Sequence, residues 1–135
     1  MPVFVFDSYA VLAFFRNETG RAVVQKLLND AVADKVELYM TCINAGEVYY
    51  MTYRKEGADK AAIVWKALQQ FPIHITSTDM NTAYKAANIK ANHKLSYADA
   101  YAAVLTIEKK GVLVTGDREF DTLTGEKGFK VKYIA

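Results

Sequence analysis

Hydrophobic residues follow two alternating patterns along the chain. Short runs of β-branched and aromatic residues, bounded by turn or polar residues, predict strands. These runs span residues 2–6, 37–42, 72–76, 112–115 and 130–134. Segments with helical spacing of apolar residues lie between them, over residues 9–15, 20–33, 44–56, 58–71, 79–92, 97–110 and 117–123. The alternation predicts an α/β fold in which helices flank both faces of a mostly parallel central sheet of about four to five strands.

Proline and glycine mark several of the predicted boundaries. Pro72 is predicted to open a strand, where its missing N–H costs least. Gly57 and Gly111 follow helical segments and are predicted to cap their C-termini. The chain has no internal repeat or linker, and its 135 residues fit one domain spanning residues 1–135.

The composition narrows the class of protein. A hydrophobic share of 52% excludes a disordered chain and predicts a well-buried core. The single cysteine, Cys42, cannot form an internal disulfide and is expected to be a small core residue in a reducing compartment. Asp7 interrupts the first apolar run, and no run approaches the roughly 20 apolar residues of a membrane helix. We therefore expect a cytoplasmic protein that makes no membrane contact.

Two aspartates come directly after predicted strands. Asp7 follows residues 2–6, and Asp117 comes shortly after residues 112–115. Ligands of open α/β sheets bind at the carboxyl ends of the strands, so these carboxylates converge if the two strands are neighbours. The alternative for each is a helix N-cap, a favoured role of Asp.

Two further acids lie in helical segments. Glu47 follows Asn44 by three residues, a spacing that approximates a capping box, and a structural role is favoured for Glu47 taken alone. Asp99 lies in SYADAYAAVLTI, which is apolar over more than one helical face. Such a helix is buried, and a buried carboxylate is costly unless it is paired or bound to a metal. A metal-binding role is therefore favoured for Asp99 over a capping box with Ser96.

Together, four acids near helix starts indicate a site for a hard divalent cation. Mg²⁺ and Mn²⁺ prefer carboxylate and water oxygens and need neither His nor Cys. His74 and His93 have no spacing typical of a zinc site, so both are interpreted as structural or surface residues.

Nearly the whole chain resembles the PIN-domain family, and in particular the VapC-like toxins of type II toxin–antitoxin pairs. The resemblance is carried, in order, by FVFDSYAVLAFF, NETGRAVVQKLL, INAGEVYYM, LSYADAYAAVLT and LVTGDREFDTL. It implies a Mg²⁺- or Mn²⁺-dependent endoribonuclease that is often a homodimer and is held inactive by a cognate antitoxin. It also implies that metal-activated water cuts RNA to leave 5′-phosphate and 3′-hydroxyl ends.

The resemblance also assigns roles by position. The family's catalytic and metal-binding acids match Asp7, Glu47, Asp99 and Asp117. Ser8 and Thr115 match hydroxyl positions that support the metal or the phosphate. Asp121 matches a less regular fifth acid, with a solvated or i,i+4 helix carboxylate beside Asp117 as its alternative. Tyr9 is bulkier than the small residue expected after Asp-Ser, so it narrows the cleft or offers a ring for base stacking.

Substrate contacts are less evident in the sequence. Candidate phosphate ligands are Arg16, Arg54, Lys94 and Arg118. Candidate stacking residues are Tyr9, Tyr97 and Phe120, since single-strand binding combines positive charge with aromatic rings. Ordinary solvated surface is the alternative for each basic residue.

A second class of function is a non-catalytic PIN-like module that binds protein or RNA. Apolar and aromatic residues cover more than one face of the helix predicted over residues 44–56. That helix is either deeply packed or meets a second subunit or an antitoxin. Receivers and haloacid-dehalogenase-type phosphatases rank low: receivers have no equivalent of Asp99, and those phosphatases need a second Asp where Tyr9 stands. A dinucleotide site lacks its G-x-G-x-x-G motif.

Overall fold

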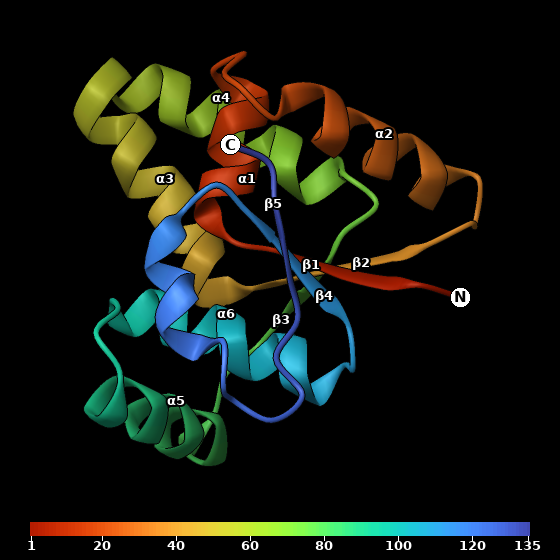
Figure 1. Cartoon of the computed structure of the whole chain (residues 1–135). Coiled ribbons are helices and arrows are strands. Elements are labelled where there is room, and N and C mark those ends of the chain that lie inside the picture. The colour runs from red at the N-terminus through yellow and green to blue at the C-terminus, as the bar shows by residue number, and fades with distance from the viewer.

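One parallel sheet of five strands organises the chain (Figure 1). The structure is a computed structural model that describes residues 1–135. The strands are β1 (Val3–Phe6), β2 (Glu37–Thr41), β3 (His74–Thr76), β4 (Val112–Thr115) and β5 (Val131–Tyr133). They lie in the order β3-β2-β1-β4-β5, and all four pairings are parallel. The predicted α/β fold is confirmed.

Six α-helices and one 3₁₀ helix connect the strands. They are α1 (Ser8–Phe15), α2 (Arg21–Val32), α3 (Cys42–Glu56), α4 (Ala58–Gln70), α5 (Met80–Asn92), α6 (Tyr97–Glu108) and the 3₁₀ helix η1 (Arg118–Leu123). The first and last residues of every helix and strand lie within two residues of the bounds of a predicted segment. No helix is both long enough and apolar enough to cross a bilayer.

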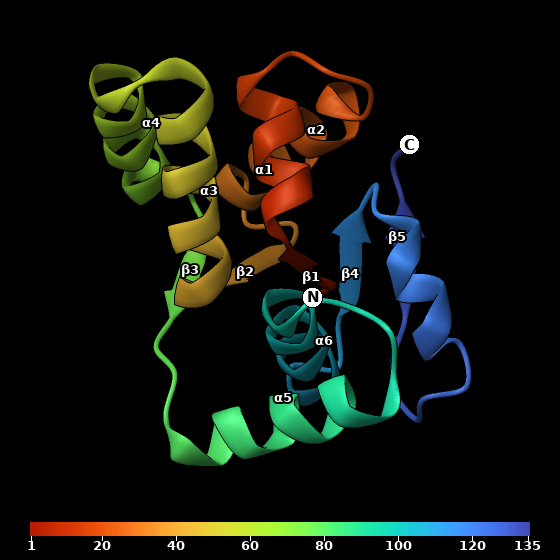
Figure 2. The same cartoon turned by 90° about the vertical axis from the view of Figure 1, so that its left-hand side faces the viewer.

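Alternate strand residues point to opposite faces of the sheet, as the pleat requires. Phe6 and Val114 join an apolar cluster with residues of α1, α2, α3 and α4. Val5 and Leu113 join a second cluster with residues of α6 and η1. In Figure 2 α1 to α4 accordingly lie above the strands, whereas α5 and α6 lie below them. Helices therefore cover both faces of the sheet, whereas the edge strand β3 keeps His74 and Ile75 exposed.

Two of the predicted boundaries are wrong, for local reasons. The third strand begins at His74 because residues 71–73 form a tight turn around Pro72, in which the Ile73 N–H donates to the Phe71 carbonyl at 2.8 Å. Gly57 does follow α3 with a left-handed φ of +91°. After α6, however, it is Lys110 and not Gly111 that takes a left-handed φ, of +53°.

Cys42 also differs from its prediction. It is the first residue of α3 and is only partly buried, so it is not a core residue. No loop separates β2 from α3, since Thr41 ends the strand and caps the helix.

The order of the strands reverses between β1 and β4. From β1 the chain moves outward to β2 and β3, and then returns to β4 on the other side of β1. Phe6 pairs with Val114 across these two strands, so the residues that follow, Asp7 and Thr115, lie side by side at the carboxyl edge. Ligands of parallel sheets bind at such a reversal point.

Candidate metal site at the carboxyl edge of the sheet

A cavity of about 840 Å³ opens beside the carboxyl ends of β1 and β4. Its acidic lining residues are Asp7, Glu18, Glu47, Asp99, Asp117 and Glu119. Arg16 is the only basic residue that lines it. The structure thus brings the four acids predicted from the sequence to one cavity, in a strongly negative environment.

Asp7 is fully buried at the junction of β1 and α1. Its Oδ1 accepts the Ala10 N–H at 3.0 Å, so Asp7 does cap α1, and its Oδ2 accepts the Thr115 hydroxyl at 2.5 Å. Burial, with a smaller contribution from the charges of Asp99 and Asp117, raises the pKa of Asp7 to about 7 against the lowering effect of these two hydrogen bonds. The two interpretations of Asp7 are therefore compatible, because one carboxylate caps a helix and lines the cavity.

Asp99 lies in the first turn of α6, and the cap of this helix is made by the preceding Ser96. The Ser96 hydroxyl caps α6 by accepting the Asp99 N–H at 3.1 Å. Burial raises the pKa of Asp99 to about 7, and the charges of Asp117, Glu47 and Glu119 add to the effect. A buried carboxylate that other carboxylates surround binds either a proton or a cation at neutral pH.

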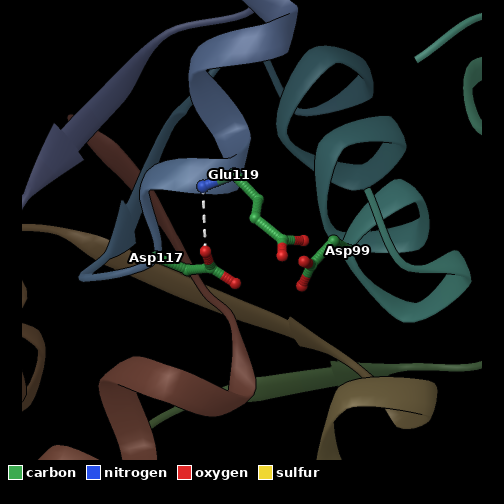
Figure 3. A group of neighbouring side chains, drawn as sticks. All are labelled: Asp99, Asp117 and Glu119. Atoms are coloured by element: carbon green, nitrogen blue, oxygen red, sulfur yellow. Dashed lines mark hydrogen bonds between the residues drawn. The ribbon is translucent and has the colours of Figure 1, made fainter. Parts of the chain in front are cut away.

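Asp117 and Glu119 complete the tightest cluster of acids. One carboxylate oxygen from each of Asp99, Asp117 and Glu119 lies within 4.8 Å of the others. Figure 3 shows the Glu119 side chain reaching from η1 toward Asp99 of α6, while Asp117 accepts the Glu119 N–H at 2.9 Å. Carboxylate oxygens on both sides of a Mg²⁺ ion lie roughly 4.2 Å apart, so this donor set fits one hard divalent cation.

Glu47 is held at the cavity wall by three neighbours. Its Oε1 accepts from the Ser8 hydroxyl at 2.9 Å and from the Asn44 amide at 3.3 Å. The Tyr50 hydroxyl donates to Oε2 at 3.5 Å. The capping box predicted for Asn44 and Glu47 is wrong, because α3 begins two residues earlier and the Thr41 side chain caps it.

The two predicted hydroxyl residues orient acids. The Ser8 hydroxyl donates to Glu47, and the Thr115 hydroxyl donates to Asp7 while it accepts the Asp117 N–H at 2.9 Å. Thr115 therefore joins the acids that follow β1 and β4.

Asp121 does not line the cavity. It is exposed and accepts the Tyr133 hydroxyl at 2.5 Å. A 3₁₀ helix has three residues per turn, so a step of four residues from Asp117 turns the side chain away. Asp121 is therefore the solvated carboxylate of the alternative, whereas the i,i+4 relation to Asp117 presumes an α-helix and is wrong.

Two acids that line the cavity, Glu18 and Glu119, were not predicted from the sequence, and of these Glu119 belongs to the tight cluster. Glu119 lies two residues after Asp117, outside the i,i+4 spacing of an α-helix. The short, turn-bounded REFDTL segment is compatible with a 3₁₀ helix, and that is the one signal that favours Glu119.

Among the basic candidates, only Arg16 lines the cavity. It follows α1, and its Nε is buried without a hydrogen-bond partner. Arg54 and Arg118 lie over the rings of Tyr50 and Tyr133, with the guanidinium carbons 5.1 and 3.9 Å from the ring centres. Neither they nor the exposed Lys94 line the cavity.

The aromatic candidates divide in the same way. Tyr9 lines the cavity. Phe120 is fully buried against Phe129 and cannot stack on a base. Tyr97 is outside the lining, and its ring packs against Tyr101 with centres 5.1 Å apart.

Comparisons with known proteins agree with this architecture. The family model described as PIN domain matches residues 4–126. A DNA-bound VapBC from Salmonella typhimurium is similar, with a TM-score of 0.75, 14% identity and full coverage of both chains. VapBC2 from Rickettsia felis, bound to a DNA fragment from its promoter, has a TM-score of 0.74 and 10% identity over 98% of this chain and 99% of that one.

A third similar structure is the sarcin–ricin loop cleaving toxin VapC20 from Mycobacterium tuberculosis. Its TM-score is 0.72, with 16% identity over 90% of this chain and 95% of that one. At these identities the likeness shows a shared fold. No curated protein matches the sequence.

Proposed function

The chain belongs to the PIN-domain family, and from that premise we propose that it is a Mg²⁺- or Mn²⁺-dependent endoribonuclease, the toxin of a type II toxin–antitoxin pair. The observation that carries the proposal is the convergence of Asp99, Asp117 and Glu119, with Asp7 and Glu47 on the same cavity. We take residues 1–135 as the nuclease domain and the cytoplasm as its place of action.

The acids are proposed to hold the cation in two groups. Asp99, Asp117 and Glu119 supply the nearest set of oxygens, while Asp7 and Glu47 line the same cavity with at least one oxygen fixed by neighbours. When bound, the cation would activate a water and neutralise charge on the scissile phosphate. Thr115, Ser8 and Asn44 position the carboxylates by donating hydrogen bonds to them.

Proton release is the counterpart of cation binding at this site. With a pKa of about 7, Asp7 and Asp99 are each partly protonated at neutral pH. A cation that binds the ionised forms displaces those protons. Protons and the cation therefore compete for the same carboxylates, and the affinity of the site for a cation should increase as pH rises.

Arg16 supports an anionic substrate. Its buried Nε has no partner in the chain, and a buried donor that lacks a hydrogen bond is costly. The rest of the side chain is partly exposed at the cavity, where the guanidinium charge would attract a phosphate oxygen.

The antitoxin partner is proposed from the fold. The similar structures from Salmonella typhimurium and Rickettsia felis are VapBC assemblies bound to DNA. A small antitoxin encoded beside this chain is the matching expectation, with the isolated toxin as a homodimer.

The proposal is tested by RNA cleavage with purified, antitoxin-free protein. We expect cleavage with Mg²⁺ or Mn²⁺ and none with EDTA. Asp99→Asn should lower the rate by more than about 100-fold, beyond the loss typical of residues that only orient metal ligands. Asp121→Asn is the matched control and should retain activity, because that carboxylate contacts Tyr133 outside the cavity.

Cleavage that persists undiminished in EDTA, once contaminating nucleases are excluded, would overturn the metal-dependent mechanism. If the chain is instead a non-catalytic PIN-like module, it should cleave no RNA under any condition, and Asp99→Asn should leave its binding function intact.

A further inference from the structure

The Tyr9 ring occupies space that exists only because residue 116 is glycine. A Cβ atom built on Gly116 would lie 2.1 Å from Cε1 and 2.4 Å from Cζ of Tyr9. The ring therefore lies directly against the backbone that joins Thr115 to Asp117. Tyr9 follows Asp7 by two residues, so its ring lies between the two segments that supply Asp7 and Asp117.

This ring is held in place but is not covered. Tyr9 lines the cavity and keeps 39% of its surface exposed. The atoms Cδ1, Cε1 and Cζ lie nearest to Gly116, and the exposed part of the side chain is open to a ligand in the cavity. A ring that is fixed before binding loses little conformational entropy when a ligand stacks on it.

Because the cavity is negatively charged, RNA binding there needs contacts that do not depend on charge. Six carboxylates and one guanidinium line it, so a polyanion is repelled over most of the wall. Even with cations bound, Arg16 alone offers a positive side chain. Base stacking on an aromatic ring is independent of charge and is available to every base.

We propose that Tyr9, seated on Gly116, is the surface on which one nucleobase beside the scissile phosphate stacks. This inference rests on the proposed ribonuclease function and adds a nucleobase contact to it. Tyr9 thereby positions the RNA strand at the acids, and the stack contributes to binding of the ground state and the transition state alike.

The test pairs variants of Tyr9 with abasic substrates. The parent substrate is a short single-stranded RNA that the wild-type protein cuts at one position, and each member of the set lacks one base near that position. For wild type, one abasic position should raise KM about tenfold with kcat little changed, since a stacked base is worth about 1–3 kcal/mol. Tyr9→Leu should raise KM on the parent RNA by the same factor and should be indifferent to that abasic position.

Two further variants separate stacking from a structural role. Tyr9→Phe keeps the ring and should behave as wild type. Gly116→Ala places a Cβ in the ring's space and should reproduce the Tyr9→Leu profile, whereas it should have no further effect on KM in a Tyr9→Ala protein, where the collision is absent.

The possible outcomes separate a failure of the stacking role from a failure of the ribonuclease proposal. If wild type cuts RNA but no abasic position loses its effect in Tyr9→Leu, the stacking role is overturned and the ribonuclease proposal stands. The same holds if Tyr9→Leu lowers kcat equally on all substrates, or if Tyr9→Phe loses as much as Tyr9→Leu. If wild type cuts no RNA with Mg²⁺ or Mn²⁺, the ribonuclease proposal fails, and the stacking role fails with it.

Discussion

Asp99 shows how the position of a residue within a helix frees its charge for another use. The N–H of Asp99 is already satisfied by the Ser96 hydroxyl, and its carboxylate extends toward Asp117 and Glu119 (Figure 3). An Asn at this position would keep the shape of the side chain and the cap, but would remove the charge. The difference between the two proteins therefore measures the cost of burying this charge together with its repulsion by the neighbouring acids.

The stability of the metal-free protein should depend on pH through this residue. The pKa of Asp99 is about 7 in the folded chain and near 3.8 when unfolded, so the folded state keeps a proton over this window and the unfolded state does not. The free energy of unfolding falls wherever the folded state binds more protons, so it falls as pH rises from about 4 to 7. In EDTA, Asp99→Asn should unfold at a higher temperature than wild type, by a small margin at pH 5 and by a larger one at pH 8.

Thermal unfolding at the two pH values, with EDTA and with excess Mg²⁺, checks this prediction. At a hundredfold excess over its dissociation constant, Mg²⁺ should stabilise wild type by roughly 2.7 kcal/mol and Asp99→Asn much less. Asp79→Asn is a suitable control, because Asp79 caps α5 far from the acids and its pKa is lowered, mainly by the Thr82 N–H. Its difference from wild type should be constant between pH 5 and 8. A constant difference for Asp99→Asn would contradict the raised pKa of Asp99 and the charge cost inferred from it.

At the scale of elements, the sequence predicted the helices and strands themselves better than the junctions between them. Periodicity predicted every strand and helix, and the rule that ligands bind at strand ends placed Asp7 and Asp117 correctly at one edge. The start of α3 was not predictable in this way, because Thr41 is at once the last strand residue and the helix cap. Glu119 was missed because periodicity does not distinguish one turn of 3₁₀ helix from α-helix.

The junction between α6 and β4 gives a test at this scale. Lys110 has the left-handed φ of +53°, which costs energy for a residue with a side chain, so Lys110→Gly should be neutral or stabilise by up to about 1 kcal/mol. Gly111 instead lies against β1, where an added Cβ would be 2.8 Å from the Val3 carbonyl oxygen. Gly111→Ala should therefore destabilise by about 1–3 kcal/mol through overpacking.

Chemical denaturation of the two variants distinguishes this structure from the cap predicted at Gly111. If Gly111 were the left-handed residue, Lys110→Gly would destabilise the chain and Gly111→Ala would owe its cost to backbone strain. Here Lys110→Gly should not destabilise the chain, and this result separates the two structures, because Gly111→Ala is destabilising in both.

At the scale of the whole molecule, one aromatic surface is left uncovered by the fold. Its residues are Tyr49 and Tyr53 of α3 and Trp65 of α4, with the Tyr49 ring 6.0 Å from Tyr53 and 5.7 Å from Trp65. Tyr53 is 49% exposed and Trp65 39%. Val48 of the same helix is fully buried, so the excess apolar residues of α3 predicted from the sequence are divided between the core and this surface.

We expect a second copy of the chain to cover this surface in solution. Rings that already pack on one another form a preformed apolar patch, and a twofold interface needs only that the same patch meet itself. Wild type should be a dimer at tens of micromolar by light scattering, and Tyr53→Ser combined with Trp65→Ser should give a monomer with an unchanged fold. Tyr84→Ser is the matched control, since Tyr84 is 71% exposed on α5, away from this surface, and should leave the dimer intact. A monomeric wild type, or a dimer that Tyr84→Ser disrupts and the double variant does not, would remove the patch from the interface and leave it to the antitoxin.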